Sequence, residues 1–89
     1  MAVERTLALP AAVTAGNAAD LLAQYESALP GDGPLVIDGT ALTSFDSSVL
    51  ALLLALRRRA EVAGKTLLSR NLSPNVRKLA LLYGVESLI

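Results

Sequence analysis

The sequence LTSFDSSVLALLLALRRR, which spans Leu42–Arg59, passes from a polar turn into an apolar segment with a basic end. Asp46, Ser47 and Ser48 can each cap a helix, because a short side-chain oxygen accepts hydrogen bonds from the free N–H groups of the first turn. The three arginines suit the negative end of the same helix dipole. We therefore predict a helix that begins near Ser47 and ends near Gly64.

The side chains of this helix separate into two faces when they are plotted at about 100° per residue. The inward face, wide enough to lie on a sheet, carries Val49, Leu52, Leu53, Leu56, Ala60 and Ala63. The outer face carries Ser47, Ala51, Leu54, Arg58 and Glu61, with Leu50 and Val62 at its margins. Near its N-terminal end the outer face is too apolar for a plainly solvated surface. We expect either another part of this chain or a second molecule to cover it.

The rest of the chain predicts strands that alternate with helices. The expected strands are Val3–Leu9, Leu35–Asp38 and Lys65–Ser69, with a short extended piece at Ala11–Val13. One helix is expected from Thr14 or Asn17 to Pro30, before the turn at 30–34, and another from Ser73-Pro74 to Gly84. In the last helix Val76, Leu79, Ala80 and Tyr83 are expected to face inward, and the tail Val85–Ile89 is expected on the sheet edge.

This alternation predicts a single α/β domain over residues 1–89, with a largely parallel sheet and right-handed crossovers. In such sheets ligands bind beyond the carboxyl ends of the strands. The loop from Gly39 to Asp46 is expected at that end, directly before the long helix.

Composition narrows the classes of function. The chain has 89 residues and no net charge, from eight basic and eight acidic residues, so nothing electrostatic favours nucleic acid or an anionic membrane. It has no cysteine and no histidine, which argues against thiolate chemistry, Ser-His triads and the usual zinc sites. The longest apolar run, Val49–Leu56, is far short of the ~20 residues of a membrane span. No export signal is visible, so we expect a cytoplasmic protein without a cofactor or metal and without membrane insertion.

Few side chains suggest chemistry. Asp32, Asp38 and Asp46 do not have the spacing of a metal-binding loop or of a catalytic pair. The arginines 57–59 point in three directions around the helix and form no single anion pocket. Ser47 has two interpretations: it caps the helix, or it presents a hydroxyl for phosphorylation or for contact with a partner. A phosphate there would meet the positive end of the helix dipole.

The order of these segments resembles the STAS family, the small domains of anti-sigma-factor antagonists and of sulfate-transporter tails. The resemblance lies in a strand at Leu35–Asp38, a spacer, and then the segment Leu42–Ser48 before an apolar helix. It extends to Ala63-Gly64-Lys65 and Leu72-Ser73-Pro74. It implies a sheet of about four strands flanked by three or four helices. In anti-sigma-factor antagonists the first serine after the aspartate, here Ser47, is phosphorylated by a partner kinase.

Within the family the chain is similar to the MlaB subgroup, the STAS subunits of phospholipid-transport ABC systems in Gram-negative envelopes. The similarity lies in the short chain, in Ala51–Leu54 and in Leu79–Tyr83. It implies a non-enzymatic subunit that binds an MlaF-like ATPase, in a complex with the permease, without itself binding lipid. The implied setting is the cytoplasmic side of the inner membrane, reached through that partner. The expected contact residues are Asp46, Ser47, Ser48, Leu50, Ala51, Leu54 and Arg58. The alternative is an anti-sigma-factor antagonist controlled by phosphorylation of Ser47.

Overall fold

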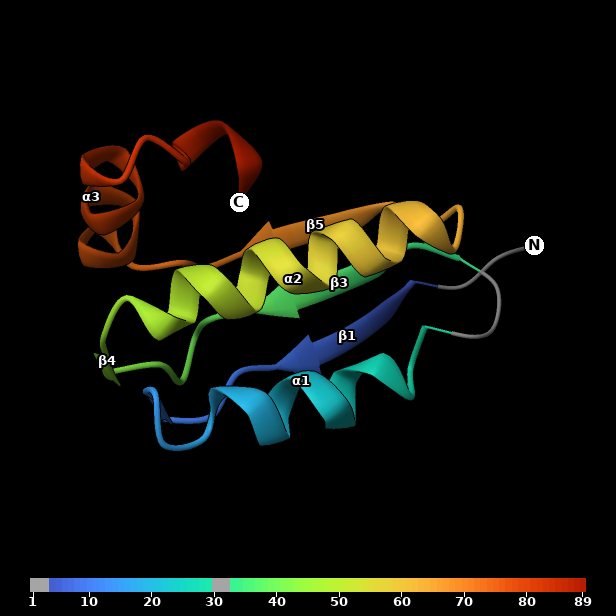
Figure 1. Ribbon diagram of the computed structural model, residues 1–89, viewed down its shortest axis with the longest axis horizontal. Coiled ribbons are helices and arrows are strands. Elements are labelled where there is room, and N and C mark those ends of the chain that lie inside the picture. Colours follow the sequence, from blue (N-terminus) through green and yellow to red (C-terminus); the bar gives the residue numbers. More distant parts are fainter. Residues whose placement is uncertain (1–3, 30–32) are drawn as a thin grey trace.

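Three parallel strands form the main sheet of the computed structural model, which describes residues 4–29 and 33–89 (Figure 1). They are β1 (Arg5–Ala8), β3 (Leu35–Asp38) and β5 (Leu67–Arg70), in the order β1-β3-β5. The central strand is β3, which pairs with both β1 and β5, and its first three residues are buried. The predicted parallel sheet is confirmed, although β5 begins two residues later than predicted.

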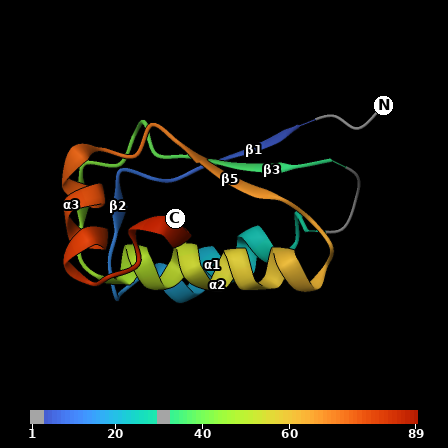
Figure 2. The same ribbon diagram turned by 90° about the horizontal axis from the view of Figure 1, so that it is seen from above.

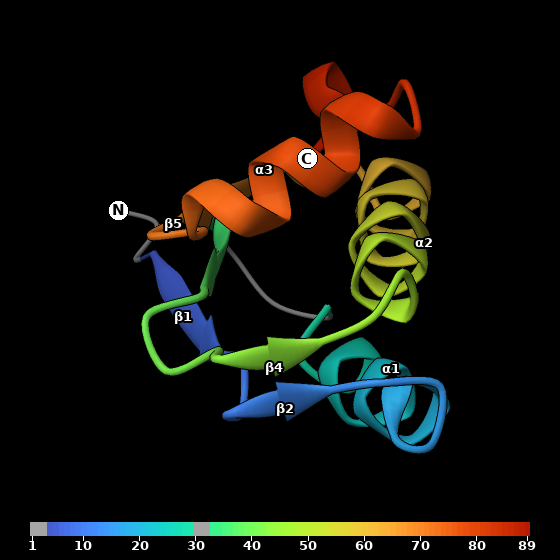
Figure 3. The ribbon, with the colours of Figure 1, turned by 90° about the vertical axis from the view of Figure 1, so that its left-hand side faces the viewer.

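Two helices cover one face of this sheet, as Figure 2 shows. They are α1 (Ala18–Glu26) and α2 (Ser48–Val62), which pack against each other. The third helix, α3 (Pro74–Leu82), crosses the end of the molecule from β5 towards α2 (Figure 3). At the same end β2 (Ala12–Val13) and β4 (Ser44–Phe45) form a second, two-stranded parallel sheet. The carboxyl ends of the main strands are therefore covered by this chain's own elements.

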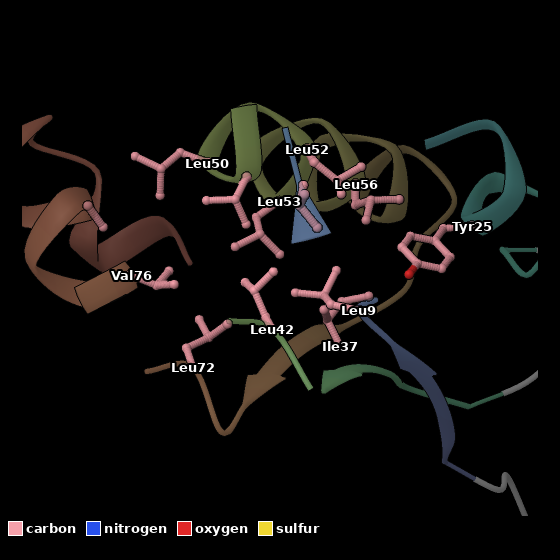
Figure 4. Packing of buried hydrophobic residues seen from close by; sticks show 13 residues of the cluster. Leu9, Tyr25, Ile37, Leu42, Leu50, Leu52, Leu53, Leu56, Leu72 and Val76 are labelled. Atoms are coloured by element: carbon pink, nitrogen blue, oxygen red, sulfur yellow. The ribbon is translucent and has the colours of Figure 1, made fainter. Parts of the chain in front are cut away.

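The space between the sheet and the helices is filled by one apolar cluster (Figure 4). Its fully buried side chains include Leu9 and Ile37 from the strand side and Leu53 and Leu56 from α2. Tyr25 of α1 closes one side of the cluster, and its hydroxyl donates to the carbonyl oxygen of Ala8 at 2.7 Å. Burial raises the pKa of this phenol. The inward face predicted for α2 is confirmed from Val49 to Ala60, whereas Ala63 is exposed beyond the helix end.

A capping bond and a close contact between two loops position α3. The Oγ of Ser73 accepts the backbone N–H of Val76 at 3.3 Å, so the predicted helix start at Ser73-Pro74 is confirmed. Upstream, the loops that follow β3 and β5 lie very close together. A Cβ added to Gly39 would lie 2.9 Å from Cδ2 of Leu72 and 3.2 Å from the carbonyl oxygen of Asn71. A side chain at position 39 would therefore force Leu72 or the loop to move.

The C-terminal segment differs from the prediction. Gly84 ends α3 with a φ of 73°, as expected of a glycine at that place. The tail then forms a 3₁₀ turn at Glu86–Leu88 that packs on α3 and contacts α2, so its predicted place on the sheet edge is wrong. Tyr83 was predicted to face inward, but 57% of it is exposed. Val3 and the turn residues Pro30–Asp32 lie outside the described residues.

Candidate functional site

The loop before α2 is fixed by one carboxylate. The Oδ1 of Asp46 accepts the N–H of Ser48 at 2.8 Å, and its Oδ2 accepts the N–H of Ala15 at 3.2 Å. The first bond caps α2, and the second ties α2 to the turn before α1. These donors, the Ser48 N–H foremost, lower the pKa of the Asp46 carboxyl. Of the three residues expected to be able to cap this helix, Asp46 supplies the side-chain cap.

Because Asp46 caps the helix, the hydroxyl of Ser47 has no capping role. Ser47 makes no side-chain cap hydrogen bond, and the residue is exposed. The next serine, Ser48, is half-buried in the first turn. The chain thus holds an exposed hydroxyl at the positive end of a 15-residue helix.

Below Ser47 runs a line of side chains at spacings of four and three residues, which we call the docking stripe. It consists of Ser47, Ala51, Leu54 and Arg58. Leu54 is half-buried and the other three are exposed. These residues occupy one side of α2, as predicted from helical periodicity.

Leu50 was expected on the same surface, and that expectation is wrong. Only 3% of Leu50 is exposed, and it belongs to the same apolar cluster as Val76 of α3. Figure 4 shows it directed from α2 towards α3. The physical reason is the course of α3, which crosses the end of the sheet and covers that margin of α2. Leu50 is therefore a core residue and is removed from the candidate surface.

The three consecutive arginines have different surroundings, as their angular spacing predicts. Arg57 donates from Nε to Oε1 of Glu61 at 3.3 Å and from Nη1 to the carbonyl oxygen of Leu88 at 3.1 Å. Arg59 forms an ion pair with Glu26 of α1. Arg58 has no ion-pair partner within residues 4–29 and 33–89. The docking stripe thus ends in an open positive charge.

The carboxylate at the end of β3 is structural. The Oδ1 of Asp38 accepts from the backbone N–H and Oγ1 of Thr40, at 3.1 and 2.7 Å, and from Nδ2 of Asn71 at 3.0 Å. These bonds, that from Thr40 Oγ1 first, lower the pKa of Asp38. The bond from Asn71 also joins the loops that follow β3 and β5. Among the described residues no group of three or more carboxylates lies within reach of one metal ion. Asp32, the third aspartate considered from the sequence, lies outside them.

Several exposed apolar side chains lie at the ends of α2 and α3. Val62, placed only at the margin of the outer face, is 87% exposed at the end of α2. Leu82 is 80% exposed at the end of α3, where Leu81 and Tyr83 are also exposed. Because α3 has only nine residues, helical periodicity separates its buried and exposed leucines poorly. Within the described part of the chain, no helix has the length and apolar content that a membrane crossing requires.

Comparison with known proteins identifies the family. A family model described as "Mlab, STAS domain" matches residues 2–89, nearly the whole chain. The chain belongs to the STAS family. A search of the curated proteins found no match for this STAS domain.

A solved structure supports the fold. The anti-sigma-factor antagonist SpoIIAA in its unphosphorylated form matches with a TM-score of 0.76 and 22% sequence identity. The match covers 99% of this chain and 80% of SpoIIAA. The predicted STAS-like α/β fold is therefore confirmed. The strands of the described residues, three in the main sheet and two in the small one, agree roughly with the expected sheet of about four.

Proposed function

We propose that this STAS domain is the MlaB-like subunit of an ABC transporter and docks on the ATPase subunit through the docking stripe. One observation carries the proposal: beside a helix margin that α3 seals, Ser47, Ala51 and Arg58 remain open to solvent in one line. No described element of this chain covers these positions, so a partner can reach them. The family model adds support through its own description, which names Mlab.

The role we infer is binding and not catalysis. A serine becomes a nucleophile when a neighbouring base accepts its proton. The carboxylate nearest in sequence, Asp46, already accepts two backbone N–H groups, and its lowered pKa makes it a poor base. The exposed Ser47 hydroxyl therefore suits recognition by another protein.

In this proposal the transporter moves phospholipids between the inner and outer membranes, and this domain supports its ATPase from the cytoplasmic side. The domain reaches the inner membrane through the ATPase and the permease and binds no lipid itself. A partner surface centred on Leu54 would complete the burial of this half-buried side chain. Ser47 would lie at the edge of the contact, where an added negative charge would weaken binding of the ATPase.

The test is purification of the tagged domain from detergent-solubilised membranes, followed by mass spectrometry of the proteins that co-purify. We expect an ABC ATPase and its permease. The matched variant is Ser47→Asp, which places a carboxylate beside Asp46 and should weaken recovery of the ATPase, while Ser47→Ala should retain it. Recovery of the ATPase in equal amounts with Ser47→Asp would remove Ser47 from the contact, and absence of any ABC subunit would contradict the proposal.

The second candidate is an anti-sigma-factor antagonist, favoured by the exposed Ser47 hydroxyl that follows Asp46 and makes no capping bond. This function requires a kinase that phosphorylates Ser47. Incubation of the domain with cell extract and ATP should then add one phosphate at Ser47, located by mass spectrometry. Ser47→Ala is the control, and capture of an anti-sigma factor in place of an ATPase would favour this candidate over the first.

A further inference from the structure

The surface on either side of Arg58 is hollowed. One hollow, of about 340 Å³, lies on α2 and is mostly apolar; Ala55, Arg58, Arg59 and Val62 line it. The other, of about 210 Å³, lies between α2 and the C-terminal tail; Leu54, Arg57, Arg58, Glu61 and Leu88 line it. Arg58 belongs to both hollows and therefore stands between them. Each hollow is large enough to receive an apolar side chain.

The charges of this surface are matched on both sides of Arg58 but not at Arg58 itself. Arg57 is neutralised by Glu61 on the same helix, and Arg59 by Glu26 of α1. Within the part of the chain that the structure describes, Arg58 has no ion pair. A partner that covered this surface without an anion would leave the guanidinium buried and unpaired, which is costly.

We propose that the segment of the ATPase that covers the docking stripe is an acidic amphipathic one. It presents a carboxylate to Arg58 and one apolar side chain to each hollow. This inference rests on the proposed function and specifies the chemistry of its partner. A carboxylate fits because the planar guanidinium offers paired N–H donors that match its two oxygens. Apolar neighbours fit because Ala55 and Val62 wall one hollow, and Leu54 and Leu88 the other.

The exposure of Val62 supports an apolar side chain of the partner in the hollow next to Arg58. Val62 is among the most exposed large apolar side chains of the described residues, and it lines the hollow next to Arg58. An apolar side chain of the partner in that hollow would remove Val62 from water. The surface that the ATPase covers therefore runs from the docking stripe's Ser47, at the start of α2, to Val62 in its last turn.

The experiment uses Arg58→Lys, which keeps the positive charge and introduces a primary amine. The variant is mixed with the ATPase captured from membranes and treated with a carbodiimide, which joins an amine to a carboxylate only when the two are in contact. We expect mass spectrometry to find the amine at position 58 linked to an Asp or Glu of the ATPase. Arg59→Lys is the matched control: its amine should link to Glu26 within the domain and not to the ATPase.

Affinity measurements give an independent readout. Arg58→Gln should weaken binding of the ATPase about tenfold, and Arg58→Glu should weaken it further, because a carboxylate on the partner would then meet a like charge. Arg59→Gln should change the affinity by less than about threefold, because Glu26 already pairs with the Arg59 charge within the domain.

The outcomes separate this inference from the proposed function. If the ATPase binds the wild-type domain but no cross-link forms at position 58 and Arg58→Glu binds normally, the inference is overturned and the docking function stands. A cross-link to a second copy of this chain would overturn it in favour of self-association. If no ATPase binds the wild-type domain, both the function and the inference fail.

Discussion

Leu50 and Leu54 lie one turn apart on α2, yet they belong to different surfaces. Leu50 is buried in the cluster that includes Val76 of α3, whereas Leu54 is half-buried in a line with exposed Ser47 and Arg58. The two side chains are chemically identical and belong to the same helix. What separates them is the path of α3, which covers one margin of α2 and leaves the other open. An apolar helix face is therefore a candidate interface only where the rest of the fold leaves it uncovered.

The largest expected effect comes from placing a carboxylate at each of these two positions. Leu50→Asp should lower the free energy of unfolding by about 4 kcal/mol or more, because it buries an unpaired charge in the core. Leu54→Asp should lower it by less than about 1 kcal/mol, because the side chain can reach water. Urea unfolding followed by circular dichroism measures both. Equal losses of unfolding free energy would show that Leu50 and Leu54 do not differ in burial.

The contrast depends on α3 being held firmly, and Gly39→Ala tests that. The added Cβ would come within 2.9 Å of the Leu72 side chain, just before α3, so the loop must move. We expect a loss of about 1–3 kcal/mol in the free energy of unfolding, as for other overpacked positions. Gly64→Ala is not a suitable control, because the φ of Gly64 is 73°. Gly16→Ala is suitable, since its Cβ would meet only Oγ1 of Thr14 at 3.6 Å.

A third comparison concerns the two serines that precede helices α2 and α3. Ser73→Ala should cost about 1 kcal/mol, because the Ser73 Oγ accepts the N–H of Val76. Ser47→Ala should change stability by less than about 0.5 kcal/mol, because Ser47 makes no cap bond. Thermal unfolding of the two variants measures both stability losses. A comparable loss for Ser47→Ala would show that this hydroxyl serves the fold and not a partner.

The smallest effect is a dependence on acid pH. The N–H and hydroxyl of Ser48 and the N–H of Ala15 lower the pKa of Asp46 in the folded domain below the ordinary value of 3.8. A carboxyl with a lowered folded pKa contributes stability above its unfolded pKa and loses it as the pH falls through the folded value. The unfolding free energy of Asp46→Asn should therefore fall less steeply below about pH 4 than that of the wild type. Parallel pH profiles would contradict this role of Asp46.

Much of the fold follows from local sequence, and the reasons are visible in particular residues. The capping pair Ser73-Pro74 and the helix-ending Gly84 act within a few residues, so their prediction needs no knowledge of the tertiary structure. The inward positions Val49–Ala60 follow from helical periodicity against a sheet. The two-residue strand β4 was missed because so short a segment carries no periodic pattern.

The candidate site was less predictable because it depends on contacts between distant segments. Periodicity placed Leu50 at the margin of the outer face, and only the crossing of α3 decides that this margin is buried. Three residues were able to cap α2, and the bond from Ala15, 31 residues away, helps to fix Asp46 in that role.

The most direct test of the docking stripe is the affinity of the purified domain for the captured ATPase, measured by isothermal titration calorimetry. The wild-type domain is compared with Leu54→Asp at a temperature where thermal unfolding shows that both are folded. A centrally placed contact residue should cost about 2 kcal/mol or more when truncated or charged, which is a loss of about 30-fold in affinity. Such a loss in a domain that stays folded is the predicted result. An unchanged dissociation constant for Leu54→Asp would contradict the account.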